Sequence, residues 1–236
     1  MARLTRHELK KDEFADHLAT VSHFFTQNRR QVVLGGGAAL VVVGLSLGVF
    51  LYLSRQQAKA NDAFSTALDT YHAPVTPTPP EGTNRLVFKT REAKYKEAMR
   101  QFTEVAGQFR RRSQGRWARY YAALCQRELG NSAAAEKELT ALVGESDPDV
   151  AAMSKMALGG LYQQTSRTAE AEKIYRDLES HPSPLVPKPA VQIALAELYQ
   201  KTNPSRATAL YQQIEKDYPG TTAGDQASRM LRGSPP

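Results

Sequence analysis

Residues 158–178 read LGGLYQQTSRTAEAEKIYRDL, and this stretch decides the fold. Its second half places Ala171, Tyr175 and Leu178 at positions i, i+4 and i+7, which lie on one face of an α-helix. Its first half holds a leucine, a glycine and a tyrosine with the spacing L-G-x-x-Y, at 158–162, on a preceding helix. The stretch therefore predicts a helical hairpin, in which a small residue lets the two helices approach and a bulky one fills the space beside it.

The helix-face pattern of a small residue followed by two bulky ones occurs four times. Successive copies begin 37, 36 and 36 residues apart. The four sets are Ala98, Phe102 and Val105; Ala135, Leu139 and Leu142; Ala171, Tyr175 and Leu178; and Ala207, Tyr211 and Ile214. A fixed period of this length is typical of repeat proteins.

The partner helices repeat as well. The pattern at 158–162 recurs as Leu195-Ala196-x-x-Tyr199, and Ala122-Ala123 occupies the matching place in the preceding unit. Turn-forming residues fall between the expected helices, at 130–131, 147–148, 166, 182–184, 203–204 and 219–220. One hairpin cannot bury its apolar face alone, so the sequence predicts an all-α solenoid of stacked hairpins with a period of about 36 residues and no sheet.

These residues resemble the tetratricopeptide repeat (TPR). The resemblance rests on the pattern at 158–162, on the trio that begins at Ala171 and on Pro182. The spacing of 36 is longer than the usual 34 of that family, and the usual first-helix tryptophan is absent. Such departures are typical of the TPR-like repeats of bacterial envelope proteins.

A second feature is the uncharged stretch at 32–53, VVLGGGAALVVVGLSLGVFLYL. As a helix it would be about 33 Å long, enough for the hydrocarbon core of a membrane. A cleaved signal peptide is the rival interpretation, but 31 residues precede the run and it is longer than usual for a signal. Within this predicted membrane helix, Gly37, Gly44 and Gly48 form a face of small residues that would let a second membrane helix approach closely. The alternative is that glycine is simply common in membrane helices.

The charges beside the apolar run predict its orientation. Six basic residues precede it, whereas only Arg55 and Lys59 follow it within 20 residues. We therefore expect a cytoplasmic N-terminus and an extracytoplasmic C-terminal part. The expected organisation is a cytoplasmic amphipathic segment at 1–31, a transmembrane helix at 32–53, a helix with a proline-rich loop at 54–89 and the TPR-like repeats at 90–236.

No motif for catalysis or metal binding is present. The 236 residues contain no glycine-rich phosphate loop, no HExxH and no paired Cys-x-x-Cys, and Cys125 is the single cysteine. Cys125 is therefore expected to be a buried structural thiol. We predict a protein that is not an enzyme and that needs no metal or cofactor.

The remaining function is recognition of other proteins, and the resemblance to TPR repeats implies which surface would bind them. The first helix of each TPR hairpin lines the concave face, which here implies a groove formed by Trp117, Tyr120, Arg127, Met153, Met156, Gln163, Ile193, Glu197 and Gln200. The alternative is that the tryptophan and the methionines pack between repeats as core. A basic patch of Arg110, Arg111, Arg112, Arg116 and Arg119 is a second candidate surface, for anionic lipid or an acidic partner; a solvated turn is the alternative.

The whole layout is similar to the ancillary translocon-subunit family, whose members are single-pass proteins of the bacterial inner membrane with periplasmic repeats. The resemblance implies a role beside the protein-export channel, with channel subunits, periplasmic chaperones or exported chains as partners. An envelope scaffold for cell division or outer-membrane assembly is the alternative. The net charge of +7 suggests no nucleic-acid partner, because no groove-reading motif accompanies it. A homodimer through the repeats is compatible with the sequence.

Overall fold

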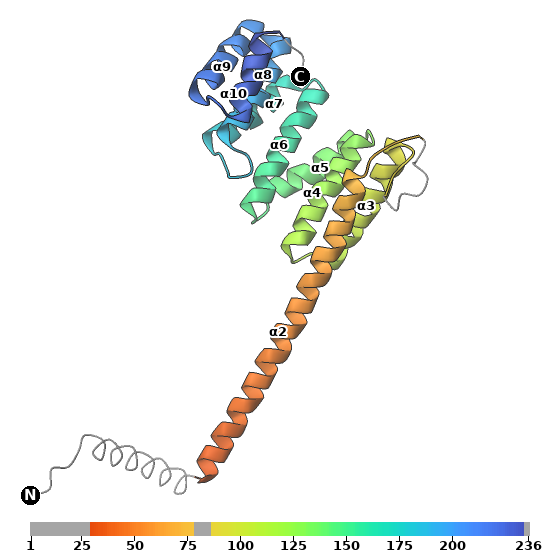
Figure 1. The fold of residues 1–236 in the computed structure, drawn as a ribbon, viewed down its shortest axis with the longest axis vertical. Helices are drawn as coiled ribbons and strands as arrows, with labels where there is room; N and C mark the ends of the chain where they lie inside the picture. The colour runs from red at the N-terminus through yellow and green to blue at the C-terminus, as the bar shows by residue number, and fades with distance from the viewer. Residues whose placement is uncertain (1–28, 78–85, 234–236) are drawn as a thin grey trace, which may run out of the picture. The chain divides into compact units, whose positions relative to one another are not determined.

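The computed structural model describes residues 29–77 and 86–233, and within these ranges the chain is helical. The predicted amphipathic segment at 1–31 lies almost wholly outside them. The helices are α2 (Arg29–His72), α3 (Arg91–Gln108), α4 (Ser113–Glu128), α5 (Ser132–Val143), α6 (Pro148–Gln164), α7 (Thr168–Ser180), α8 (Lys188–Thr202), α9 (Pro204–Asp217) and α10 (Thr222–Leu231) (Figure 1). The prediction of an all-helical protein is confirmed for the described residues.

Helix α2 is 44 residues long and contains the uncharged stretch. The large apolar side chains that the structure describes in this stretch are exposed, among them Leu40 at 74% and Phe50 at 66%. Among the described residues α2 is the one helix that is long and apolar enough to cross a membrane. A Cβ added at Gly37, Gly44 or Gly48 would meet no atom within 4 Å, so these positions are open on the helix surface.

Contacts divide the chain after Ala58 into two units. The second unit begins at Lys59 and thus includes the last turns of α2. There Ala60 and Ala67 are fully buried in one cluster with Phe102 and Cys125. The end of α2 is therefore the first helix of a hairpin whose second helix is α3.

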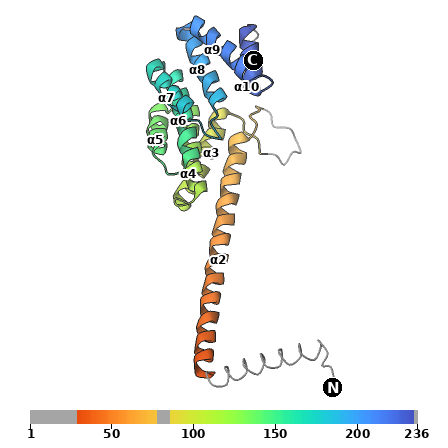
Figure 2. The ribbon, with the colours of Figure 1, turned by 90° about the vertical axis from the view of Figure 1, so that its left-hand side faces the viewer.

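Three further hairpins follow: α4 with α5, α6 with α7, and α8 with α9, after which α10 packs on α9 and α8. Figure 2 shows the pairs stacked in chain order. All twelve side chains of the four repeated trios are at most 3% exposed. The predicted repeat pattern is confirmed, because each trio is the buried face of the second helix of one hairpin.

The even-numbered helices form a layer of their own. Helix α4 contacts α6, α6 contacts α8, and α8 contacts α10. Within the described part of the chain, no such contacts join α3, α5, α7 and α9 to one another. The even-numbered helices are therefore closer together and form the inner layer of the solenoid.

The turns show why the chain reverses where it does. Gly130 and Ser166, 36 residues apart, both have positive φ, of 81° and 60°. In each case the next residue closes the preceding helix with a backbone hydrogen bond, from Asn131 N–H to Gln126 (2.9 Å) and from Arg167 N–H to Tyr162 (2.8 Å). Side chains that accept backbone N–H bonds begin several helices, namely Thr90, Asp147, Asn203 and Thr221.

The long connection between α2 and α3 is held at its two ends. The N–H of Thr76 donates to the carbonyl of Phe88 at 2.9 Å, and the N–H of Phe88 donates to that of Pro74 at 3.0 Å. Among the residues that the structure describes, this pairing of Val75 with Phe88 is an isolated bridge outside any strand.

Candidate partner-binding face

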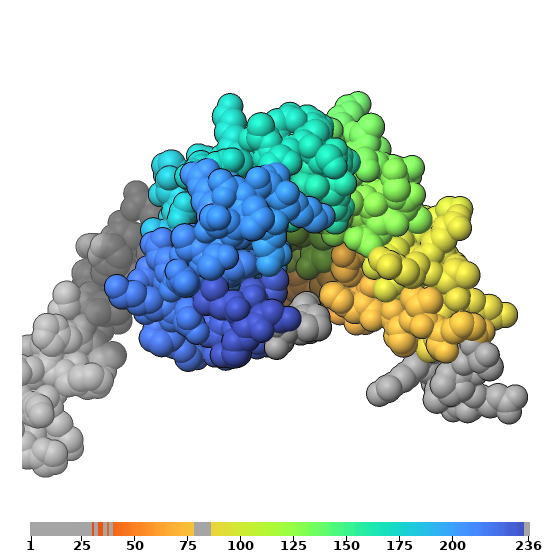
Figure 3. Space-filling view, turned by 90° about the horizontal axis from the view of Figure 1, so that it is seen from above, coloured from red at the N-terminus to blue at the C-terminus, as the bar shows by residue number. Residues whose placement is uncertain are grey.

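The inner helices present their predicted groove residues in matching register. Positions 36 and then 37 residues apart fall on α4, α6 and α8 in turn. Three of the resulting rows are Trp117 and Met153; Tyr120, Met156 and Ile193; and Arg127, Gln163 and Gln200. A fourth row contains Leu124, Gly160 and Glu197. Figure 3 shows the repeats as an arch that is hollowed on one side, between the end of α2 and α10.

The apolar members of these rows are largely packed into the protein. Tyr120 is 5% exposed and Ile193 is 7% exposed, so both belong to the core. Trp117, Met153 and Met156 are partly buried against the same clusters, and the ring of Trp117 meets that of Tyr120 edge-on at 5.7 Å. The apolar rows thus serve packing between repeats and leave only part of their surface on the inner face.

The polar members stay nearer to solvent. Gln200 is exposed, whereas Arg127, Gln163 and Glu197 are partly buried. The guanidinium of Arg127 donates to its neighbour Glu128 at 3.1 Å. The inner layer therefore has a positive group on α4 and a negative one on α8.

A tyrosine from the outer layer reaches this face. The hydroxyl of Tyr175, on α7, donates to Oε1 of Gln163 at 3.2 Å. Its ring lies against Gly159, where an added Cβ would come within 2.5 Å of the ring. Glycine at this position is what allows the ring to lie across α6, and burial raises the pKa of Tyr175 to about 12.

Glu197 lies among groups from three helices. Nε2 of Gln226, on α10, donates to its carboxylate at 3.0 Å. Tyr211, on α9, is 2% exposed, and its hydroxyl is buried without a hydrogen-bond partner. Burial raises the pKa of Glu197, and burial together with this carboxylate raises the pKa of Tyr211 to about 12.

Two hollows lie where α10 packs against α8 and α9. One, of about 410 Å³, lies between α8 and α10 and is lined by Pro187, Ala190, Ile193, Ala223 and Gln226 among others. The other, of about 370 Å³, is lined by Gln200, Tyr211 and Met230 among others. Sequence reasoning missed Gln226 and the hydroxyls of Tyr175 and Tyr211, because the tyrosines fit the buried trio pattern and Gln226 follows the last full hairpin.

The predicted basic patch is partly neutralised. Arg110 and Arg111 are exposed in the turn between α3 and α4. Arg116 and Arg119 instead form ion pairs with acidic side chains of α5 and of the turn that follows it. These pairs are Arg116 with Asp147 at 3.3 Å, and Arg119 with Glu138 at 2.6 Å and with Glu145 at 2.5 Å. The two arginines tie α4 to the rest of its own hairpin and to the start of the next.

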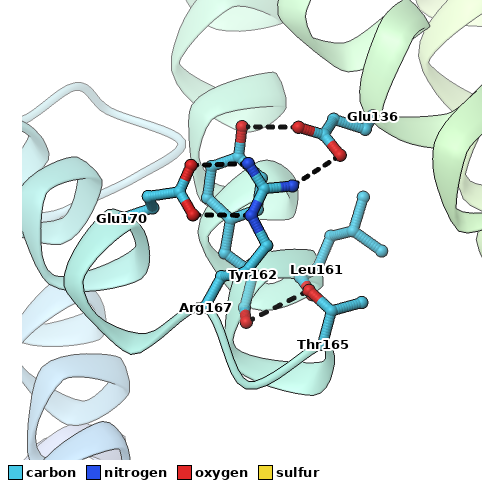
Figure 4. Close-up of polar contacts among 6 residues, drawn as sticks. All are labelled: Glu136, Leu161, Tyr162, Thr165, Arg167 and Glu170. Carbon is cyan, nitrogen blue, oxygen red and sulfur yellow. Dashed lines mark hydrogen bonds and ion pairs between the residues drawn. The ribbon is translucent and has the colours of Figure 1, made fainter.

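A polar cluster joins the second and third hairpins (Figure 4). Arg167 pairs with Glu136 at 2.7 Å and with Glu170, and its guanidinium lies 4.0 Å from the centre of the Tyr162 ring. The hydroxyl of Tyr162 donates to Glu136 at 3.0 Å. A tyrosine at this position of the repeat thus connects the hairpins through a carboxylate and a stacked arginine.

The next pair of hairpins has a similar cluster. The hydroxyl of Tyr199 donates to Glu172 at 2.6 Å and accepts from Arg176 at 2.8 Å. The guanidinium of Arg206 lies 4.5 Å from the centre of the same ring. Because these contacts are satisfied within the protein, they stabilise the stacking of hairpins.

No cluster of three or more metal-ligating side chains occurs among the residues that the structure describes. Cys125 is fully buried beside the first hairpin, and burial raises its pKa to about 12. A thiol in this state is a poor nucleophile.

One solved structure with a similar fold is a set of nearly identical TPR-like repeats of a Podosopora anserina protein described as a putative kinesin light chain. The alignment covers 73% of this chain and 83% of that one, with a TM-score of 0.52 and 14% sequence identity. The fold is a TPR-like α-solenoid. No protein-family model matches the sequence, and no curated protein matches it. In this TPR-like solenoid, α4, α6 and α8 are the first helices of their hairpins, on which the resemblance places the concave face.

Proposed function

We propose that this chain is a scaffold that binds segments of other proteins on the inner face of its TPR-like repeats. The observation that carries the proposal is the register of that face. Three successive inner helices present side chains at matching positions, among them the polar groups of Arg127, Gln163 and Glu197, and a hollow lies between inner helices α8 and α10. An extended surface of this kind suits contacts with a polypeptide.

The proposal includes a membrane anchor. The support is the exposed apolar surface of α2 and the excess of basic residues before it. In this arrangement the protein is a single-pass protein of the bacterial inner membrane with its repeats in the periplasm. A role ancillary to protein export, with channel subunits, periplasmic chaperones or exported chains as partners, follows from the similarity in layout to the ancillary translocon-subunit family.

Site-specific photo-crosslinking in intact cells tests this proposal. A photoreactive amino acid at Gln200, which is exposed on inner helix α8, should capture partner proteins. The matched control is the same amino acid at Lys137, which is exposed on outer helix α5. Equal capture from both positions, or none from Gln200, would contradict binding on the inner face.

The identity of the captured proteins separates the two versions of the proposal. Export-channel subunits or periplasmic chaperones support the export role. Components of cell division or outer-membrane assembly support the alternative of an envelope scaffold for those processes. Capture of a second copy of the chain would instead indicate a homodimer.

A further inference from the structure

Glu197 is a partly buried carboxylate on inner helix α8. Its one hydrogen bond in the described structure comes from the neutral side chain of Gln226, and no lysine, arginine or histidine among the described residues pairs with it. By contrast, Glu128, on inner helix α4, pairs with both Arg91 and Arg127. A partly buried carboxylate without a cation is costly, and it provides a ready partner for a cationic ligand.

The surroundings of Glu197 supply a second, independent observation. The hydroxyl of Tyr211 is buried and unpaired on the outer side of the same carboxylate. Tyr211 thus gives no hydrogen bond to the Glu197 carboxylate, whose one bond comes from Gln226. Buried polar groups in native proteins usually have a hydrogen-bond partner, so this hydroxyl can still accept a bond from a donor that reaches it, a water or a ligand group.

The apolar hollow between α8 and α10 gives the site a place for an apolar side chain of a ligand. Ile193 lies one helical turn before Glu197 on the same face of α8, and it lines the hollow between α8 and α10 with Ala190 and Ala223. The four residues from Ile193 to Glu197 correspond to about 6 Å along α8. In an extended peptide, side chains two residues apart point the same way and are about 6.7 Å apart. One peptide segment can therefore fill the hollow with one side chain and reach Glu197 with the next side chain on that face.

We propose that Glu197 and the hollow between α8 and α10 form a subsite for an extended peptide in which a lysine or arginine lies two residues from an apolar side chain. The basic group binds the carboxylate of Glu197, which Gln226 holds in place, and the apolar side chain lies against Ile193. This inference rests on the proposed function, because it names the chemistry of the segment that the inner face binds.

The test uses the full chain in a mild detergent and three labelled peptides measured by fluorescence polarisation. The peptides are capped glycine-serine sequences that contain leucine-serine-lysine, leucine-serine-glutamine or leucine-serine-glutamate. The lysine peptide should bind about tenfold more tightly than the glutamine peptide, which is the size expected for one charge-assisted contact. Glu197→Gln should abolish that preference, and Glu197→Lys should transfer it to the glutamate peptide.

Glu104→Gln is the matched control, because Glu104 is an exposed glutamate on outer helix α3 and should leave the preference unchanged. A lysine preference that survives in Glu197→Gln overturns the inference, and so does the absence of binding by all three peptides. Neither result decides the scaffold proposal, which depends on the crosslinking from Gln200. The charge-reversed variant guards against a simple loss of folding, because it gains a preference that the wild type lacks.

Discussion

The second and third hairpins fill the space between their two helices with different pairs of side chains. At positions 36 residues apart, the second hairpin has Ala123 and Leu139, and the third has Gly159 and Tyr175. All four lie in buried surroundings, and the ring of Tyr175 occupies the place that a Cβ of residue 159 would take. A smaller residue on the first helix is thus matched by a larger one on the second, which preserves the combined volume of the pair.

Of the substitutions predicted here, Gly159→Ala should cause the largest loss of stability, because it disrupts this matched pair. The added methyl group would overlap the Tyr175 ring, which is 2% exposed and has little room to move. We expect a loss of about 2 kcal/mol in the free energy of unfolding, measured by chemical denaturation of the full chain in detergent. The double variant Gly159→Ala with Tyr175→Leu reproduces the pair of the second hairpin and should recover most of the loss. A double variant no more stable than Gly159→Ala alone would show that the two hairpins do not share one packing rule.

The polar clusters around Tyr162 and Tyr199 allow the contact between the second and third hairpins to be compared with the contact between the third and fourth. Tyr199 is 4% exposed and its hydroxyl has two charged partners, whereas Tyr162 is more exposed and its hydroxyl donates to Glu136 alone. Tyr199→Phe should cost about 1.5 kcal/mol, and Tyr162→Phe about 0.5 kcal/mol. Thermal unfolding of the two variants side by side checks the order, and equal losses would contradict it.

Two glutamates should show opposite dependence of stability on pH. The hydrogen bond from Tyr199, with Arg176 contributing, lowers the pKa of Glu172 below its ordinary value of 4.5. Its contribution to stability is present above the pKa of the unfolded chain and is lost as pH falls through the lower folded value. Burial instead raises the pKa of Glu197, so its carboxylate opposes folding above that raised value and no longer does so below the unfolded pKa.

At pH 7, Glu172→Gln should therefore lower the melting temperature and Glu197→Gln should raise it, each by the equivalent of less than about 1 kcal/mol. The Glu197→Gln difference should vanish near pH 4, whereas the Glu172→Gln difference should persist to a lower pH. Melting curves of both variants from pH 3 to pH 7, a range set by these two shifts, provide the check. A change of the same sign for both at pH 7 would contradict the assignment of their surroundings.

The turn after α6 gives the smallest expected effect. Ser166 has the positive φ that Gly130 has 36 residues earlier, and a serine in this conformation is strained. Ser166→Gly should stabilise the protein by about 0.5 kcal/mol, because the relief of strain exceeds the entropy that glycine adds to the unfolded chain. Gly130→Ala is the matched reverse change and should destabilise. Differential scanning calorimetry resolves both, and a destabilised Ser166→Gly would be the contrary outcome.

The sequence alone was sufficient for the hairpins, because each buried trio depends only on spacing within one helix. It was also sufficient for the 36-residue register that relates Trp117 on α4 to Met153 on α6. It could not show that Tyr120 and Ile193 are covered, since the covering side chains come from other hairpins. Nor could it show that Arg119 pairs with Glu138 and Glu145, because such pairs depend on the distance between helices.

The pairing of the last turns of α2 with α3 is another feature that the sequence could not show. The apolar residues of these turns recur at helical spacing, but the proline-rich connection that follows the turns conceals their pairing with α3. Ala60 and Ala67 nevertheless bury completely, because alanine suits a close approach between helices. A repeat whose two helices are separated by a long loop keeps its packing and loses its regular spacing in the sequence.

The single cysteine offers a direct measurement of motion. Cys125 is fully buried where the first two hairpins meet, so an alkylating reagent reaches it only after α4 separates from its neighbours. The rate of its modification in intact cells therefore reports how often this junction opens, without any introduced label. A bound partner that holds the hairpins together would slow that rate.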